Sequence, residues 1–508
     1  MSAGYAEPGG SLARLIALRA AERPDFGFLH VGLDGPWSIG TIASAAQALA
    51  RRLRELGLQP GARAVVRLGN DERFVAALAA VWQRGASVIA MHPAAPADDV
   101  RRVVESMQGA VVVTAPEDRS VENLPVPVVR FDRLDRNDPT VTELDVPPVD
   151  DDEEALVLLT SGSTGAPKGV VLTHGNGWSN LRATVSAFRR DTNLAPIPDE
   201  VKPPNLVANP LSHTAGVVRL LFALYVGRSV VLLPKFAAVA AKAAIDHYGI
   251  DHLTINPSML RMLLEDLPPD ADLGKVRYAS SGTAPLPATL RDAFEQRFGV
   301  PVLQAYGQTE AFGGVAIESV RDVLAGRRRP GSVGKALPGV ELRIASSDGT
   351  NAPAGTEGEV LVRTRSATAG YVGDAAGSGR PIDDDGWLYT GDLGHLDQDD
   401  YLFITGRLKN IIICGGFNIV PEEVEAALIA DDAVRDASVI GVPDERLGEV
   451  PVAAVEASDD GDAILTRLGD RLAPYKRPRC ILVVDSLPRV PNGKVDVAAV
   501  RALVASQT

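Results

Sequence analysis

LLTSGSTGAPKGVVLTH, from Leu158 to His174, joins an apolar run to a loop of hydroxyl-bearing residues and glycines. The loop contains, in order, Thr160, Ser161, Gly162, Ser163, Thr164 and Gly165, and Lys168 follows. Glycines let the backbone turn tightly and present N–H groups to an anion, while the hydroxyls add donors and the lysine adds positive charge. The pattern therefore indicates a phosphate-binding loop after a buried strand, although it matches neither Walker A nor G-x-G-x-x-G. A flexible surface turn is the plainer alternative, but such turns rarely combine these residues directly after an apolar strand.

Helical and strand-like segments alternate on both sides of this loop, from about residue 11 to 305. SLARLIALRAAERP and TIASAAQALARRLRELGL have the periodicity of amphipathic helices, and ARAVVRL, SVIAM, AVVVTA and ALVLL have the length and composition of strands. This alternation predicts an α/β architecture with a largely parallel sheet. After about residue 330, short β segments bounded by Gly, Asp and Pro predict an antiparallel β-rich subdomain.

The last hundred residues return to a mixed pattern, in which IVPEEVEAALIA predicts a helix and ASVIGVPD and RCILVVDSLP predict strands. The fold class that we predict is α/β. It has a large N-terminal body of several subdomains, residues 1–405, and a small α+β C-terminal domain, residues 411–508.

Composition excludes several classes of function. The 508 residues carry a net charge of −14, which gives no global attraction to nucleic acid or to anionic membranes. Two cysteines, Cys414 and Cys480, cannot form a disulfide framework, and no CxxC or HExxH spacing suggests a metal site of those kinds. The N-terminus has no signal-peptide pattern, and the most apolar stretch, 217–234, is interrupted by Arg219 and Arg228. We therefore expect a cytoplasmic protein that binds no nucleic acid and spans no membrane, and a homodimer is compatible with the sequence.

The loop after Leu158 resembles the phosphate-binding signature of the adenylate-forming superfamily, which includes acyl- and aryl-CoA synthetases, nonribosomal adenylation domains and luciferases. Four further stretches resemble the motifs of that superfamily in the same order. They are QAYGQTE at 304–310 (preceded by SSGTAPLP at 280–287), GWLYTGDLG at 386–394, GRLKNIIICGGFNIVPEEVE at 406–425 and LPRVPNGKVD at 487–496. The resemblance extends over roughly residues 10–500, and its motifs begin at the phosphate loop.

The resemblance implies a site for ATP and Mg²⁺. It places Tyr306 against the adenine and Thr309 at the α-phosphate, and it assigns Mg²⁺ to Glu310 together with Thr160. A hard cation prefers carboxylate and phosphate oxygens, so the implied Mg²⁺ ligands agree with its chemistry. The other implied nucleotide contacts are the loop residues Ser161 to Gly165, Lys168, Gly282, Thr283, Ala284 and Gly307. Taken alone, YGQTE is also compatible with an ordinary helix start.

The later motifs imply the ribose site and a moving domain. Asp392 accepts hydrogen bonds from the ribose hydroxyls and Arg407 lies near the ribose and phosphates. Lys409, within a hinge at 406–410, is the residue about which the C-terminal domain rotates. Gly415 and Gly416 belong to the loop that lines the channel for the thiol substrate. Outside the family context, an Asp before Leu-Gly is a turn residue, and ICGGFN is a turn between a strand and a helix.

Lys494 matches the lysine that reaches from the C-terminal domain into the active site. A carboxylate attacking the α-phosphate of ATP brings two anions together, and a lysine that contacts both lowers their repulsion. In an isolated NGK sequence, a solvated lysine in a turn is the plainer alternative. Lys476, in APYKRPR, resembles a family linker whose basic residues meet CoA phosphates, and a solvated turn is an equal alternative.

The implied reaction is that of an AMP-forming acid–CoA ligase. A carboxylic acid attacks ATP to give an acyl-adenylate and pyrophosphate, the small domain rotates, and coenzyme A takes the acyl group. Two alternatives stay open at this point. The adenylate is passed instead to a carrier protein, an amine or another nucleophile, or the chain is a nucleotide-binding protein without catalysis.

The acyl pocket is expected among three stretches: NPLSHTAGVVR at 209–219, SGTAP at 281–285 and AFGGVAI at 311–317. His213 resembles a histidine that lines or gates this pocket, and a core histidine satisfied by the backbone is the alternative. Small residues in these stretches leave room for a bulky or long acyl group. No arginine stands out as a carboxylate clamp, although Arg219 and Arg228 are near in sequence, so we expect an apolar monocarboxylic acid, whether fatty, alicyclic or aryl.

Overall fold

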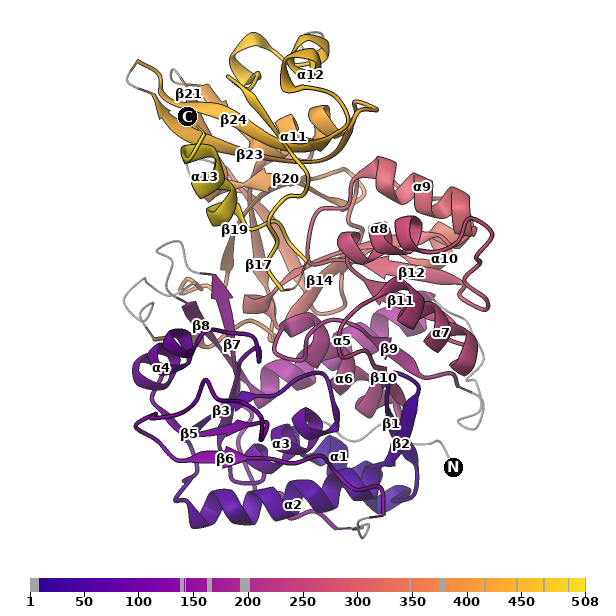
Figure 1. Cartoon of the computed structure of the whole chain (residues 1–508), viewed down its shortest axis with the longest axis vertical. Helices are drawn as coiled ribbons and strands as arrows, with labels where there is room; N and C mark the ends of the chain where they lie inside the picture. The colour runs from indigo at the N-terminus through magenta and orange to yellow at the C-terminus, as the bar shows by residue number, and fades with distance from the viewer. Residues whose placement is uncertain are drawn as a thin grey trace.

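The computed structural model describes residues 9–137, 141, 143–161, 167–191, 202–346, 349–373, 381–414, 417–444, 446–468, 471–491 and 493–507. A large N-terminal body carries a small C-terminal domain at one end (Figure 1). The body contains a seven-stranded and a five-stranded sheet, each with a parallel part and antiparallel pairs at one edge, a four-stranded sheet with one reversed strand, and an antiparallel sheet, and the C-terminal domain has a sheet of its own. The predicted α/β class with a large body and a small C-terminal domain is confirmed.

The strand that leads into the phosphate loop lies inside a seven-stranded sheet of order β18-β8-β7-β4-β3-β5-β6. Strands β7, β4, β3, β5 and β6 run parallel, whereas β8 turns back antiparallel to β7 after the loop and β18 pairs with its outer edge. The strands are β3 (Arg63–Arg67), β4 (Ser87–Ala90), β5 (Gly109–Thr114), β6 (Val128–Arg130), β7 (Glu154–Ser161), β8 (Pro167–Thr173) and β18 (Gly370–Val372).

Both faces of this sheet are buried, which explains why its strands read as continuous apolar runs. Val65 and Val157 point to the face covered by α4 (Ala97–Ser106), and they form one core with its valines. Their neighbours Val66 and Leu158 point to the other face and pack with α2 (Ile39–Glu55) and α3 (Glu72–Trp82). The alternation follows from the two-residue period of a strand.

Two further sheets complete the α/β part of the body. One has the order β2-β1-β10-β9 and the other β11-β12-β13-β14-β15. Their strands are β1 (Gly27–Val31), β2 (Asp34–Ser38), β9 (Asn205–Val207), β10 (Val230–Leu232), β11 (His252–Ile255), β12 (Tyr278–Ser281), β13 (Val302–Gln308), β14 (Gly313–Ile317) and β15 (Lys335–Ala336). The helices are α1 (Arg14–Glu22), α5 (His174–Asp191), α6 (Thr214–Val226), α7 (Ala238–Tyr248), α8 (Pro257–Asp266), α9 (Ala288–Phe298) and α10 (Val320–Leu324). Helices α5 and α6 pack on each other and on β14, so they bring the two halves of the body together.

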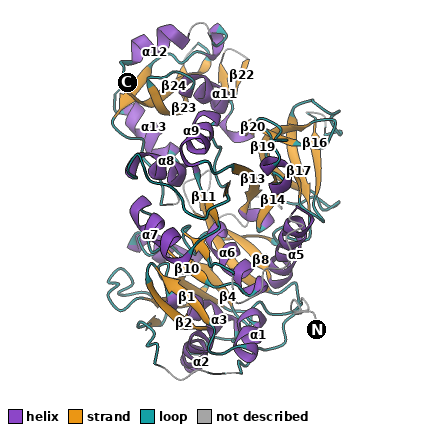
Figure 2. Cartoon of the chain, turned by 90° about the vertical axis from the view of Figure 1, so that its right-hand side faces the viewer, coloured by secondary structure: helices purple, strands orange, loops and turns teal. Residues whose placement is uncertain are grey.

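The β-rich subdomain that the sequence predicts after residue 330 is an antiparallel sheet of order β16-β17-β19-β20. Its strands are β16 (Glu341–Ala345), β17 (Gly358–Arg363), β19 (Leu388–Leu396) and β20 (Leu402–Arg407). Figure 2 shows these strands side by side, below the C-terminal domain.

A single turn of 3-10 helix, η3 (Leu408–Asn410), connects β20 to the first strand of the C-terminal sheet. That sheet has the order β22-β21-β24-β23, with β25 parallel to β24. Its elements are β21 (Ile412–Cys414), β22 (Phe417–Ile419), α11 (Pro421–Ile429), β23 (Val434–Asp444), β24 (Gly448–Ala457), α12 (Gly461–Leu468), β25 (Ile481–Val484) and α13 (Val497–Ala505). The predicted hinge at 406–410 coincides with this connection, and its hinge role stays a prediction.

Helix α8 is one part of the body that the C-terminal domain contacts, and strand β20, against which α11 packs, is another. Helix α8 begins at Pro257, and the Asn256 side chain caps it by accepting from the Met259 N–H. On its first turn, the Ser258 hydroxyl donates to the Gly493 carbonyl at 2.7 Å. This contact places the residue after Gly493, Lys494, next to the body. Over the part of the chain that the structure describes, no helix has the length and apolar character needed to cross a membrane.

Candidate active site

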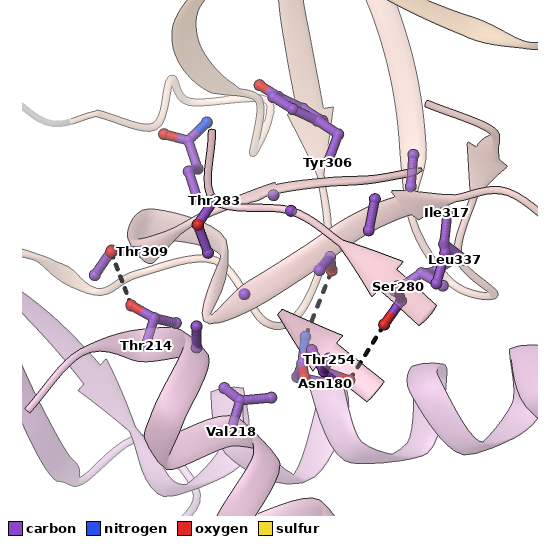
Figure 3. Close-up of a pocket in the computed structure, with 18 of the residues that line it drawn as sticks. Asn180, Thr214, Val218, Thr254, Ser280, Thr283, Tyr306, Thr309, Ile317 and Leu337 are labelled. Atoms are coloured by element: carbon purple, nitrogen blue, oxygen red, sulfur yellow. Dashed lines mark hydrogen bonds between the residues drawn. The ribbon is translucent and has the colours of Figure 1, made fainter. Parts of the chain in front are cut away.

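A cavity of about 510 Å³ lies where the body, the antiparallel sheet and the C-terminal domain meet. Its wall is built by β7, β8, α5, α6, the ends of β11 to β14, β19, β20 and η3, and the C-terminal domain contributes Lys494. Figure 3 shows part of this wall, with Thr214 and Val218 on α6 facing Thr309 and the strand ends. Residues from almost every predicted motif therefore meet in one place.

Four cationic side chains gather at one part of the wall: Lys168, Arg407, Lys409 and Lys494. Burial and the nearby Arg407 lower the pKa of Lys409, and burial, Arg407 and Lys409 lower the pKa of Lys494. Lys494 has solvent-exposed surface because it projects into the open cavity, yet enough protein surrounds it to disfavour its charge. Like charges held this close are relieved by an anionic ligand, so this part of the cavity is suited to phosphates.

Thr309 and Glu310 face these cations from the short helix η2 (Thr309–Ala311). The Thr309 and Thr214 hydroxyls share a hydrogen bond of 2.8 Å (Figure 3). The Glu310 carboxylate accepts from the Tyr371 hydroxyl at 3.2 Å, and the Lys168 ammonium lies 5.4 Å from the centre of the Tyr371 ring. Tyr371 on β18 thus orients both an acidic and a basic residue of the site.

The same wall carries the two predicted Mg²⁺ ligands, since Glu310 and Thr160 both line the cavity. Within the described residues, no group of three or more His, Cys, Asp or Glu side chains is arranged to hold a metal ion by itself. Mg²⁺ usually keeps several waters and is held by one or two carboxylates together with substrate phosphates, so one carboxylate beside a phosphate site is a sufficient donor set. The residues present fit Mg²⁺ bound with a nucleotide.

Asp392 lies directly behind the cavity wall and is only 3% exposed. One carboxylate oxygen accepts from the Tyr306 hydroxyl at 2.6 Å, and the other accepts from Arg407 Nε at 2.5 Å. The register of β19 against β20 pairs Asp392 with Arg407, so the antiparallel sheet itself fixes this ion pair. Burial and the neighbouring carboxylate raise the pKa of Tyr306, which stays a neutral donor.

The QAYGQTE motif is the end of strand β13 followed by the single turn of 3-10 helix η2, so no α-helix begins in it. At Gly307 a Cβ atom would lie 2.0 Å from the Gly313 carbonyl oxygen, so only glycine fits where β13 and β14 approach. Thr283 has φ +73°, an uncommon conformation for a non-glycine residue, in the loop after β12.

The structure brings most of the predicted site residues together. Those that line the cavity are Thr160, Lys168, Gly282, Thr283, Tyr306, Gly307, Thr309, Glu310, Arg407, Lys409 and Lys494. Asp392 lies behind the wall and is hydrogen-bonded to Tyr306 and Arg407, which line the cavity. The predicted Gly162, Ser163, Thr164, Gly165, Gly415 and Gly416 lie outside the described residues, and for Ser161 only the backbone at the end of β7 is described.

Besides Asp392, two predicted residues are described but are not part of the cavity wall: Ala284 and His213. His213 caps α6 with its backbone, and its Nε2 is buried without a hydrogen-bond partner among the described residues. Burial, with smaller contributions from His92 and Lys494, lowers the pKa of His213 to about 4. His213 is therefore a neutral imidazole beside the cavity, and its proposed gating role stays a prediction.

No sequence motif singles out Tyr371 or Asn180, which also line the cavity. Tyr371 lies outside every motif, and it reaches the site because β18 pairs with β8 across about 200 residues of sequence. Asn180 lies on α5, and its side-chain amide is 3.5 Å from the Gly314 carbonyl (Figure 3). Hydroxyl and amide residues of this kind carry no recognisable sequence signal.

Known proteins share this architecture. Residues 17–372 match the family of AMP-binding enzymes, and residues 423–494 match the AMP-binding enzyme C-terminal domain. Sulfoacetate–CoA ligase from Cupriavidus necator is 34% identical over 505 residues, covering 96% of each chain. Feruloyl-CoA synthase from Amycolatopsis sp is 33% identical over 469 residues, covering 89% of this chain and 91% of the relative.

Solved structures agree. o-Succinylbenzoate CoA synthetase from Bacillus subtilis, in complex with its acyl-adenylate intermediate, has a TM-score of 0.82 at 27% identity, covering 95% of this chain and 96% of that one. An amide bond synthetase from Marinactinospora thermotolerans has a TM-score of 0.82 at 29% identity, covering 97% and 99%.

The fold and the cationic cavity define an adenylate-forming enzyme, as the motifs predict. The chain belongs to the family of AMP-binding enzymes. Its curated relatives are acid–CoA ligases, which confirms the prediction of a ligase of the acyl-CoA synthetase class.

Proposed function

We propose that the protein is an AMP-forming acid–CoA ligase that adenylates a carboxylic acid with ATP and then transfers the acyl group to coenzyme A. One observation carries the proposal. Lys494, from the C-terminal domain, lines the same cavity as the cations Lys168 and Arg407 and the motif residues Thr309 and Glu310 of the body. This arrangement suits a reaction in which two anions must meet.

In the first half-reaction, the acid's carboxylate attacks the α-phosphate of ATP and pyrophosphate leaves. Lys494 contacts the attacking carboxylate and the phosphate, and it lowers the repulsion between them as they approach. Thr309 donates its hydroxyl to an α-phosphate oxygen and is oriented by its hydrogen bond to Thr214. Lys168 binds the outgoing pyrophosphate together with the loop that precedes it.

Asp392 accepts hydrogen bonds from the ribose hydroxyls, for which its carboxylate retains free lone pairs beside Tyr306 and Arg407. The Tyr306 ring packs against the adenine. Glu310 and Thr160 would hold Mg²⁺, which neutralises charge on the phosphates when it is bound. Tyr371 holds the Glu310 carboxylate in place for that role.

We propose that the second half-reaction uses a different face of the C-terminal domain, because Lys494 lines the cavity in the present arrangement. Residues 1–405 and 411–508 are then two bodies that rotate about 406–410, with Lys409 at the pivot, and Gly415 and Gly416 line the thiol channel. Contacts between the C-terminal domain and α8 include exposed ones, such as Arg261 to the Arg435 carbonyl at 2.8 Å. Exposed contacts of this kind break at little cost.

A second candidate keeps the adenylation and changes the acceptor. The amide bond synthetase of similar fold makes an amine or a carrier protein a plausible alternative to coenzyme A. The acids named for the relatives differ in chemistry: sulfoacetate carries a sulfonate as a second anion, whereas ferulate carries a neutral phenol. They leave the acyl group of this enzyme open.

Pyrophosphate release tests the proposal. The protein is incubated with ATP, Mg²⁺ and a panel of fatty, alicyclic and aromatic acids and their ω-carboxylated and ω-sulfonated analogues, each with and without coenzyme A. Release that requires an acid and accelerates with coenzyme A is the expected result. Release that requires an acid but is indifferent to coenzyme A contradicts the proposed acceptor, and release that no acid stimulates contradicts the ligase.

The acid and coenzyme A are the partners that the proposal requires, and we expect the enzyme to work in the cytoplasm, where ATP and coenzyme A are both present. A homodimer stays a prediction, and light scattering at micromolar protein concentration measures it.

A further inference from the structure

An arginine projects from α6 onto the wall of the active-site cavity, away from the phosphate-binding cations. Arg219 lines the cavity, and so do Val218 and Phe222 on the same helix. It lies five residues after Thr214, whose hydroxyl is bonded to Thr309 at the α-phosphate site. At 1.5 Å per residue, these two positions are about 7.5 Å apart along the helix axis.

Arg219 has no carboxylate to pair with among the described residues, where it forms no hydrogen bond and no ion pair. Burial lowers the pKa of the Arg219 guanidinium, and the Tyr278 hydroxyl has the smaller, opposite effect of raising that pKa. A guanidinium nevertheless stays protonated in proteins, so the cavity contains a desolvated positive charge. Such a charge is costly unless an anion pairs with it.

Asp251 and Glu318, two acids near this end of the cavity, are already paired with other arginines. Arg228, nine residues further along, lies 3.7 Å from Asp251. Glu318, which lines the cavity, accepts from the Gln304 N–H and lies 3.4 Å from Arg328 Nε. Arg219 is thus the cation left over for a ligand.

Apolar side chains line part of the same cavity. They include Phe222, Ile317 and Leu337, and Gly313 and Gly314 line it beside β14. Two polar groups drawn there are hydrogen-bonded within the wall: Thr254 bonds to Ser280, and the Asn180 amide bonds to the Gly314 carbonyl (Figure 3). The cavity therefore combines the cations near the phosphate site with Arg219 and apolar side chains on its wall.

We propose that the acid activated by this enzyme carries a second anionic group, a carboxylate or a sulfonate, that pairs with Arg219, and that a short carbon chain or a single ring separates it from the reacting carboxylate. The inference rests on the proposed function for the identity of the reaction. The proposal replaces the expectation, made from the sequence, that the substrate is an apolar monocarboxylic acid. That expectation was based on no arginine being assigned to the acyl pocket. A monocarboxylate would bury Arg219 without a counter-ion, whereas a dianion completes the pair.

The test compares matched acids. Each monocarboxylic acid is paired with its ω-carboxylated and ω-sulfonated analogue, for example hexanoate with adipate and 3-phenylpropanoate with 3-(2-carboxyphenyl)propanoate. Two readouts are taken on the full chain: acid-dependent pyrophosphate release, and binding of the acid by calorimetry in the presence of a non-hydrolysable ATP analogue. The carboxylated and sulfonated arms show which anion Arg219 prefers.

We expect kcat/KM for the best dianionic acid to exceed that of its monoanionic partner by about 10²–10³-fold, as loss of one partner of a buried ion pair costs this much. Arg219→Met should remove the preference and bring the two acids within a few-fold of each other. Arg277→Met is the matched control, because Arg277 lies nearby, pairs with Asp251 at 3.3 Å and does not line the cavity. It should keep the preference.

The outcomes separate the two proposals. If wild-type enzyme activates monocarboxylic acids as well as their dianionic partners, or if Arg219→Met keeps the preference, the assignment of Arg219 is overturned and the ligase stands. If dianionic acids bind tightly, lose binding in Arg219→Met and yet stimulate no pyrophosphate release, the anion site stands and the ligase is overturned. If no dianionic acid binds or reacts better than its partner, the second anionic group is refuted by both readouts.

Discussion

Among the described residues of the C-terminal domain, Lys494 is the cation that lines the cavity, and replacing it with alanine removes that charge. Unit charges 4 Å apart interact by about 4 kcal/mol at an effective dielectric constant near 20. Lys168, Arg407 and Lys409 remain, so the site stays cationic and still binds the nucleotide. The loss is therefore concentrated in the step where the two anions meet, and we expect adenylation to fall by about 10²–10³-fold, as when one transition-state contact is removed.

The assay separates the half-reactions. Acid-dependent exchange of pyrophosphate into ATP reports adenylation, and thioester formation from chemically prepared acyl-adenylate and coenzyme A reports the second step. Lys494→Ala should lose the first and keep the second. Lys242→Ala is the control, because Lys242 is an α7 lysine paired with Asp246 outside the cavity. Equal loss of both steps, or full adenylation by the variant, would refute the assignment of Lys494.

Three further predictions follow from the site. Asp392→Asn weakens the pair with Arg407 and the ribose contacts, so KM for ATP should rise by about 10–100-fold with little change in melting temperature; an unchanged KM contradicts the ribose role. Because burial and neighbouring cations lower the pKa of Lys494 below the usual 10.5, adenylation should decline on the alkaline side before an ordinary lysine titrates, and Lys494→Arg should move that decline to higher pH; identical pH profiles contradict this. Gly307→Ala places a Cβ 2.0 Å from the Gly313 oxygen, so the free energy of unfolding should fall by about 1–3 kcal/mol in thermal or urea denaturation; wild-type stability contradicts the close packing.

Sequence patterns predicted the architecture well where periodicity carried the information. ALVLL reads as a buried strand because both faces of the sheet are covered, and the structure has Val157 and Leu158 in two different cores. The pairing of distant strands had no such signal. Strand β18 joins β8 through contacts that depend on the position of the antiparallel subdomain, which no local pattern encodes.

The same distinction holds for the site. Lys168, Glu310 and Lys494 come from three separate motifs and line one cavity. Phosphate chemistry alone singled out Lys168, whereas Glu310 and Lys494 were identified by the resemblance to the adenylate-forming superfamily, and their roles stay predictions. In the sequence, Arg219 was an interruption of an apolar run and one of two arginines near the expected acyl pocket, with nothing to single it out as an anion ligand. The proposed anion-binding role of Arg219 depends on which face of α6 lines the cavity and on Asp251 being paired with Arg228. Both are properties of the packed structure.

The products of a single incubation test the central claim most directly. The protein, ATP, Mg²⁺, coenzyme A and the acid that gives the fastest pyrophosphate release are combined, and the products are measured by mass spectrometry. We predict AMP, pyrophosphate and the acyl-CoA thioester in equal amounts. AMP with an acyl product other than the thioester would contradict coenzyme A as the acceptor, and ADP with inorganic phosphate would contradict adenylation itself.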